Sequence, residues 1–259
     1  MKDSELHHEL MQMIRAQGAN LVGVGPVERF KGAPRGHRPE DIVPGAQSVI
    51  TFGIRIPHLA SHWPELGMAR DSEILPSENR PEMLQNFFYH TVGYDLINDR
   101  LNQIALQVAN VLEEAGYRSI FFPATFGASY NRFQELIPGA GFGLFSLRHA
   151  AVLSGLAEFG LNNVAVTSKY GPRIRFNAVI TAAHFPPTSL LKEKVCLGAE
   201  CSQCVTECPE GCITLLPTSR DEIFWHSPPA RSDVARCRET RKSHYCMGRC
   251  IRVCPVGGQ

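Results

Sequence analysis

Two cysteine-rich stretches decide the fold of this chain: Cys196-x4-Cys201-x2-Cys204-x3-Cys208-Pro209 and Cys237-x8-Cys246-x3-Cys250-x3-Cys254-Pro255. Both end in C-x3-C-P, which is the ending of the bacterial run C-x2-C-x2-C-x3-C-P. In that run three cysteines bind one [4Fe–4S] cluster, and the fourth binds the other cluster. The duplicated ending therefore predicts a module that holds two [4Fe–4S] clusters, as in a bacterial two-cluster ferredoxin.

Crossed pairing of the two stretches gives two predicted sets of four ligands. The first set is Cys196, Cys201, Cys204 and Cys254, and the second set is Cys208, Cys237, Cys246 and Cys250. The ninth cysteine, Cys212, is expected to be a small buried side chain, with replacement of Cys196 or Cys237 as the alternative. A single cluster and structural zinc are the rival interpretations, but zinc sites favour paired C-x2-C knuckles and this chain has one C-x2-C.

Composition sets the frame around this module. The chain has 259 residues and a net charge of +1, so no overall basic field indicates nucleic acid binding. The first residues lack the apolar core of a signal peptide, and no apolar run is long enough to cross a bilayer, so we expect a cytoplasmic protein without membrane contact. Disulfides rarely persist in that compartment, which again favours metal binding by the cysteines.

All nine cysteines lie in the last part of the chain, which suggests two domains. We expect an α/β domain over residues 1–190 and a double-cluster domain over residues 191–259. Hydrophobic periodicity predicts helices over 4–17, 95–115 and 147–158, and strands over 20–25, 48–54, 119–122, 163–167 and 175–181. The polar, proline-punctuated stretch 57–81 is predicted to be a long loop, either a lid or substrate loop or a solvated insertion.

Four blocks of sequence, in order, resemble the epoxyqueuosine reductases and the related reductive dehalogenases: residues 38–50, 147–163, 170–175 and 179–181. The resemblance implies an α+β protein, in which a nitroreductase-like α/β body binds a corrinoid (cobalamin) and a following ferredoxin-like module supplies electrons. By the same resemblance, the corrinoid pocket would be lined by Gly155, Gly160, Asn163, Gly171 and Arg173.

The chain also departs from that family. The family carries a proton-donating Asp just before the helix at 147, whereas residues 145–148 contain no acid. The helical-repeat tail of the epoxyqueuosine reductases and the twin-Arg leader of membrane-targeted dehalogenases are missing as well. We therefore expect tRNA not to be the substrate, and we take Tyr130, His149 and His90 as candidate proton donors.

These observations predict an enzyme, an iron–sulfur oxidoreductase that depends on a corrinoid. Its clusters would pass low-potential electrons to a cofactor or substrate held by the N-terminal domain. The expected partners are a small-molecule or corrinoid substrate and an electron donor such as ferredoxin or flavodoxin. The arginines after residue 230 would raise the potential of the clusters and dock an acidic donor. The alternative is a non-catalytic electron-transfer protein, or a reductase of another protein's corrinoid.

Overall fold

The computed structural model describes residues 3–71, 73–74, 78–124, 144–216, 229–243, 246 and 248–258. The chain forms two compact units. The first comprises residues 1–54, 98–157 and 175–192, and the second comprises residues 55–97, 158–174 and 193–259. The last crossing between the units, after Lys192, lies two residues from the domain boundary expected at 190, but the second unit also contains two earlier segments.

The first unit is built on one four-stranded sheet. Its strands are β1 (Leu21–Pro26), β2 (Ser48–Arg55), β6 (Ile174–Thr181) and β3 (Ser119–Phe121), in that spatial order. β1 pairs antiparallel with β2, with Leu21 opposite Gly53, and β3 pairs antiparallel with β6, with Ser119 opposite Thr181. The predicted strands at 20–25, 48–54, 119–122 and 175–181 are thus confirmed.

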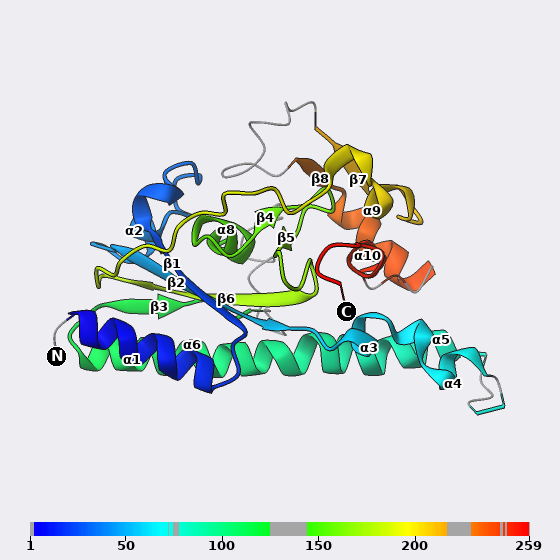
Figure 1. The fold of residues 1–259 in the computed structure, drawn as a ribbon, viewed down its shortest axis with the longest axis horizontal. Coiled ribbons are helices and arrows are strands. Elements are labelled where there is room, and N and C mark those ends of the chain that lie inside the picture. Colours follow the sequence, from blue (N-terminus) through cyan, green and yellow to red (C-terminus); the bar gives the residue numbers. More distant parts are fainter. Residues whose placement is uncertain are drawn as a thin grey trace. The chain divides into compact units, whose positions relative to one another are not determined.

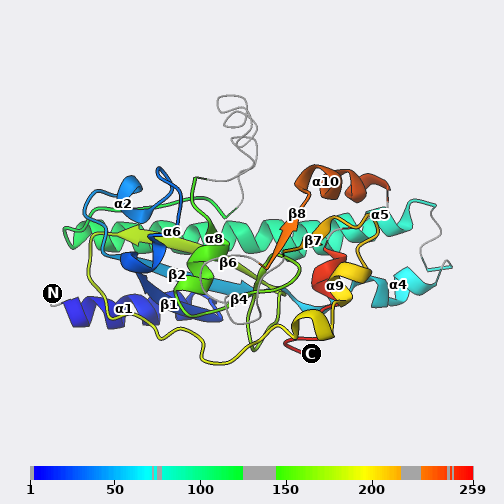
Figure 2. The same cartoon turned by 90° about the horizontal axis from the view of Figure 1, so that it is seen from above.

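Helices cover both faces of this sheet (Figure 1). α1 (Asp3–Ala16) and α6 (Leu96–Glu114) lie on one face and run roughly antiparallel, as the view from above also shows (Figure 2). α8 (Leu147–Leu153) lies on the other face, where it shares a core with η1 (Val27–Phe30) and α2 (Pro39–Ile42). The periodicity that predicted α1 and α6 reflects real burial, because α1 buries Leu6, Leu10 and Ile14 and α6 buries Leu101, Ile104, Ala105, Val108 and Leu112.

The prediction of a helix over 147–158 was too long. α8 ends at Leu153, and Gly155 follows it with a φ of +72°, a left-handed conformation that ends helices and suits glycine. The chain then enters β4 (Glu158–Phe159), which belongs to the second unit and pairs antiparallel with β5 (Ala165–Val166).

The stretch 57–81 contains short helices, so the prediction of a long loop was wrong. In the second unit the chain forms α3 (His58–Ser61), η2 (Trp63–Glu65), α4 (Gly67–Arg70) and α5 (Arg80–Leu84), and then the π-helix η3 (Gln85–Asp95), against which α3 packs. Pro57, Pro64 and Pro81 stand at the beginnings of three of these turns, where proline needs no N–H donor and its φ already suits a helix.

The cysteine-rich part of the second unit consists of small elements. They are η4 (Gly198–Glu200), α9 (Gln203–Thr206), β7 (Ile213–Leu215), β8 (Ala230–Ser232), α10 (Val234–Ser243) and α11 (Arg249–Arg252). β7 pairs antiparallel with β8, and α9 packs against α11. Within the described part of the chain, no helix combines the length and the apolar character that crossing a membrane requires.

Candidate functional site

Four cysteine sulfurs gather around one cavity of the second unit. Cys196, Cys201, Cys204 and Cys254 all line it. Burial raises the pKa of Cys204 to about 12, and the nearby sulfurs of Cys196, Cys254 and Cys201 add to the rise. Burial also raises the pKa of Cys254, with Cys196 and Cys201 again contributing. This group of four, called thiol group 1 below, coincides with the first predicted ligand set.

A second group surrounds Cys250 in α11. Burial raises the pKa of Cys250 to about 12, and the sulfurs of Cys246, Cys204, Cys237 and Cys208 contribute further. Cys208, Cys237, Cys246 and Cys250, called thiol group 2 below, coincide with the second predicted ligand set. Because Cys204 influences Cys250 as well, the two thiol groups are neighbours.

The chemistry of these groups fits a bound metal cluster. Burial and the neighbouring sulfurs make ionisation of Cys204, Cys250 and Cys254 harder, and a bound cation would offset this cost. Four converging thiolates are the ligands of a [4Fe–4S] cluster. A backbone hydrogen bond is already in place, because the Cys212 N–H donates to the Cys208 Sγ at 3.2 Å. The Cys212 side chain itself is 3% exposed, as expected for a small buried residue.

Two side chains of the β4–β5 region hold the cysteine segments, and sequence reasoning missed both. The buried carboxylate of Glu158, at the start of β4, accepts a hydrogen bond from the Cys196 backbone N–H. Burial raises the pKa of Glu158, while the N–H groups of Cys196 and Val195 oppose that rise. Asn162 donates from Nδ2 to the Cys250 carbonyl at 3.2 Å. Glu158 thus positions one residue of thiol group 1, and Asn162 positions one residue of thiol group 2.

Arg173 holds the chain that follows the last cysteines. Its Nη1 donates to the carbonyls of Ile251 and Cys254 at 3.3 and 2.9 Å, and its Nη2 donates to those of Val256 and Gly257 at 2.5 and 2.6 Å. The residue is 8% exposed, and burial lowers its pKa. The charge of Arg173 also favours a thiolate at Cys254. The guanidinium is therefore engaged with thiol group 1 and its surroundings, whereas the resemblance assigned it to a corrinoid.

The other four residues assigned to the corrinoid also face their own chain. A Cβ on Gly155 would meet the Ser189 carbonyl, one on Gly160 would meet Val166 and Asn162, and one on Gly171 would meet the Val256 carbonyl. Asn163 has a φ of +59° and donates from Nδ2 to the Ser232 Oγ at 3.2 Å. These contacts explain the residues without a bound group, and Gly160 also lines the cavity of thiol group 1, so their assignment to a corrinoid stays a prediction.

Two of the three candidate proton donors lie among the described residues, one in each unit. His149 lies in α8 of the first unit, where its Nδ1 is 2.7 Å from the Ser146 Oγ. Burial, and then the charge of Arg148, lowers the pKa of His149 to about 4, so its ring is neutral at pH 7 and is no imidazolium acid there. His90 lies in η3 of the second unit and pairs with Asp95 at 3.1 Å. Tyr130 lies outside the described residues.

No protein-family model matches the chain, and no curated protein matches it in sequence. Solved structures do match its fold. An epoxyqueuosine reductase bound to an epoxyqueuosine-modified tRNA stem loop is 14% identical, with a TM-score of 0.59, and the match covers 99% of this chain and 66% of that one. The catabolic reductive dehalogenase NpRdhA in complex with 3-bromo-4-hydroxybenzoic acid is 15% identical, with a TM-score of 0.60, over 96% of this chain and 31% of that one.

A third match is an epoxyqueuosine reductase from Bacillus subtilis, 15% identical with a TM-score of 0.53, over 88% of this chain and 55% of that one. The chain thus spans less than two thirds of the length of these proteins. At such identities the matches establish the fold. The chain has the mixed α/β fold of the epoxyqueuosine reductases and reductive dehalogenases, as the resemblance predicted.

Proposed function

We propose that this chain is an iron–sulfur oxidoreductase that binds two [4Fe–4S] clusters and passes low-potential electrons to a cofactor or a small substrate. The observation that carries the proposal is the division of eight thiols into two neighbouring groups of four. Each group takes its members from both cysteine-rich stretches, which is the crossed arrangement of a two-cluster ferredoxin module.

The residues around the thiols support an electron-transfer role. Hydrogen bonds to the sulfurs, nearby charge and burial set the reduction potential of a cluster. The Cys212 N–H reaches the Cys208 sulfur at 3.2 Å, and the charge of Arg173 favours a thiolate at Cys254. Both interactions stabilise negative charge on sulfur, so both tune the cluster potential upward in this proposal.

A corrinoid is the acceptor that the shared fold suggests, since one matching dehalogenase structure is described in terms of B12-dependent dehalogenation. A corrinoid would supply the metal-centred reduction of a substrate. The five residues assigned to it are engaged with the chain itself, so their contacts do not favour a corrinoid at this place. The electron donor, ferredoxin-like or flavodoxin-like, belongs to the same proposal, as does a cytoplasmic location.

Anaerobic purification followed by iron, sulfide and cobalt analysis tests the proposal. We expect about eight irons and about eight acid-labile sulfides per chain, and an electron paramagnetic resonance signal after reduction. One bound zinc without acid-labile sulfide would contradict it. A visible spectrum of the same sample separates the two acceptor classes. Corrinoid absorption supports the corrinoid-dependent enzyme, and a spectrum of clusters alone supports the electron-transfer alternative.

A further inference from the structure

A further group of candidate metal ligands contains no cysteine. His58 in α3, His62 just after α3 and Glu65 in η2 belong to consecutive short turns of the second unit. Their ligand atoms all lie within 4.8 Å of one another. His58 Nε2 is 3.4 Å from Glu65 Oε2.

We propose that His58, His62 and Glu65 form a binding site for one divalent transition-metal ion of the zinc class. Two imidazoles and one carboxylate are a recurrent zinc ligand set, with a fourth position left for water or a substrate. Nothing in the two-cluster proposal uses these side chains, and the metal site does not depend on that proposal.

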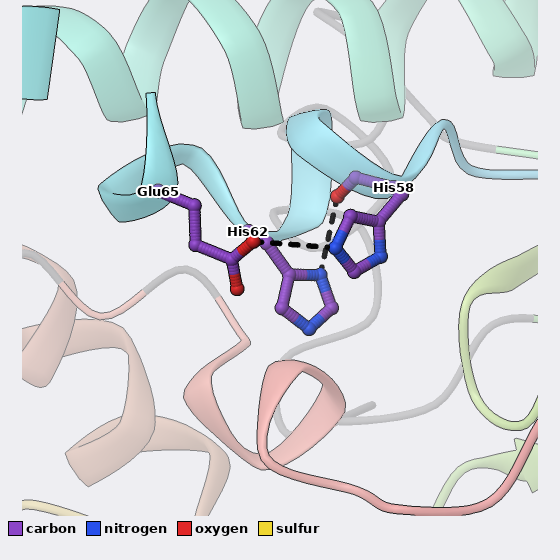
Figure 3. A group of neighbouring side chains, drawn as sticks. All are labelled: His58, His62 and Glu65. Carbon is purple, nitrogen blue, oxygen red and sulfur yellow. Dashed lines mark hydrogen bonds and ion pairs between the residues drawn. The ribbon is translucent and has the colours of Figure 1, made fainter. Parts of the chain in front are cut away.

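The hydrogen bonds of His62 orient its ring for this role. Its Nε2 lies 3.1 Å from the Arg252 carbonyl, and its Nδ1 lies 2.9 Å from the Ser61 Oγ and 3.1 Å from the His58 carbonyl. With the ring N–H on Nε2, donating to Arg252, Nδ1 must leave the His58 carbonyl in order to bind an ion. Figure 3 shows Nδ1 joined by a hydrogen bond to the His58 carbonyl, while Nε2 points away from His58. A metal-binding histidine almost always donates its other ring N–H to a carboxylate, a carbonyl or a water. The bond to Arg252 supplies that outer contact.

Neutral imidazole is also the form that binds a metal. Burial lowers the pKa of His62, which keeps its ring unprotonated near pH 7. Two cations oppose the site, because the charge of Arg173 acts on His62 and that of Arg252 acts on Glu65. We therefore expect a site of modest affinity that exchanges its metal, unlike a closed four-ligand structural site.

Closure on the ion needs a small movement. Ligand atoms about 2.0–2.2 Å from one ion are about 3.3 Å apart, so separations within 4.8 Å must shrink by at most about 1.5 Å. The rings of His58 and His62 are stacked, with centroids 4.0 Å apart, so one ring must turn. The His58 and Glu65 side chains are 36% and 44% exposed, which leaves them free to turn around the better fixed His62.

Zinc binding measured by equilibrium dialysis tests the site. The anaerobically purified full chain is dialysed against Zn²⁺, in the wild type and in His58→Ala, His62→Ala and Glu65→Gln. Because every variant keeps all nine cysteines, zinc bound to thiols cancels when variant and wild type are compared. We expect one equivalent fewer, or an affinity weakened at least tenfold, in each variant. Glu65→Gln changes an exposed side chain and is not expected to disturb folding.

His90→Ala is the matched control, because it removes a half-exposed histidine of the same unit that has a carboxylate partner but no second histidine. We expect it to bind zinc as the wild type does. Equal zinc binding in the wild type and the three site variants would overturn the proposal, as would an equal loss in His90→Ala. The iron content of each sample is measured in parallel, so failure of the two-cluster proposal is seen separately from failure of this one.

Discussion

The sheet of the first unit and the cysteine-rich segment of the second are held together by different physical means. The sheet unit is rich in side chains without solvent exposure, among them Val49, Ile50, Phe52 and Leu101. In the described part of residues 193–258, four residues are buried: Cys212, Ile213, Pro229 and Ala230. Apolar burial can stabilise the sheet unit. The few buried residues of the cysteine-rich segment can rarely stabilise a fold by themselves, and segments of this kind depend on metal ligation. Under the two-cluster proposal, two regions of one chain therefore fold for different reasons.

The strongest test of this difference removes one thiol. Cys204→Ala should reduce the iron content from about eight to about four or fewer per chain, and should unfold the surrounding segment, because Cys204 influences both thiol groups. Iron analysis and circular dichroism measure these effects. Cys212→Ala is the control and should keep its iron, since its side chain lies in neither group. Normal iron in Cys204→Ala, or lost iron in Cys212→Ala, would refute the ligand sets.

A cavity in the core of the sheet unit should lower the free energy of unfolding without changing the iron content. Ile104→Ala truncates a side chain of α6 with no solvent exposure, and we expect the free energy of unfolding to fall by about 2–5 kcal/mol. Iron content below the unfolding transition should not change. Leu106→Ala, on the same helix but 51% exposed, should have little effect on either quantity. Urea unfolding with parallel iron analysis decides, and iron loss in Ile104→Ala alone would mean that the two regions do not fold independently.

Two glycines of the sheet unit with left-handed backbone conformation allow a further test of its packing. Gly155 and Gly116 have φ values of +72° and +89°, so alanine should cost about 1–2 kcal/mol at either position. A Cβ at Gly116 meets nothing, whereas one at Gly155 meets the Ser189 carbonyl, so Gly155→Ala should be the more destabilising. Thermal unfolding measures the difference. If Gly155→Ala keeps its stability but loses a bound corrinoid, the cofactor assignment of Gly155 gains over the packing explanation.

The last prediction concerns the pH dependence of the stability of the sheet unit. The folded chain lowers the pKa of His149 from 6.5 to about 4, so between these values the unfolded chain binds more protons. Stability is then complete above pH 6.5 and falls, by at most about 3 kcal/mol, as the pH drops towards 4. His149→Gln should flatten this dependence, whereas replacing the exposed His8 by Gln should not. Urea midpoints at pH 7, 5.5 and 4.5 supply the measurement, and equal slopes in wild type and His149→Gln would contradict the prediction.

Local pattern was enough to predict much of the sheet unit. α6 repeats apolar residues at helical spacing and is followed by Gly116, and β2 and β6 are runs of apolar and β-branched residues between turns. Local pattern failed where prolines begin helices and where Gly155 ends one. The prolines of the stretch 57–81 were interpreted as loop residues, although proline is equally common in the first turn of a helix.

The candidate site was predictable where the sequence spacing of its ligand residues is characteristic. The duplicated C-x3-C-P stretches were sufficient to propose the two thiol groups. His58, His62 and Glu65 have the spacing i, i+4 and i+7, which places side chains on one helical face and would have indicated the proposed metal site. Glu158 and Arg173 have no such signal, because their partners lie 38 and about 80 residues along the chain. Tyr130 remains an untested prediction.

The crossed membership of the thiol groups also has a consequence for spacing. Cys204 and Cys208 belong to different groups but are four residues apart, and so are Cys250 and Cys254. Four residues span at most about 14 Å of chain. These two tethers begin in α9 and α11, which pack against each other. Two short covalent connections would thus limit the separation of two clusters bound there. Insertions between Cys208 and Cys237 would lengthen the connection between the two stretches and leave the electron path between the clusters unchanged.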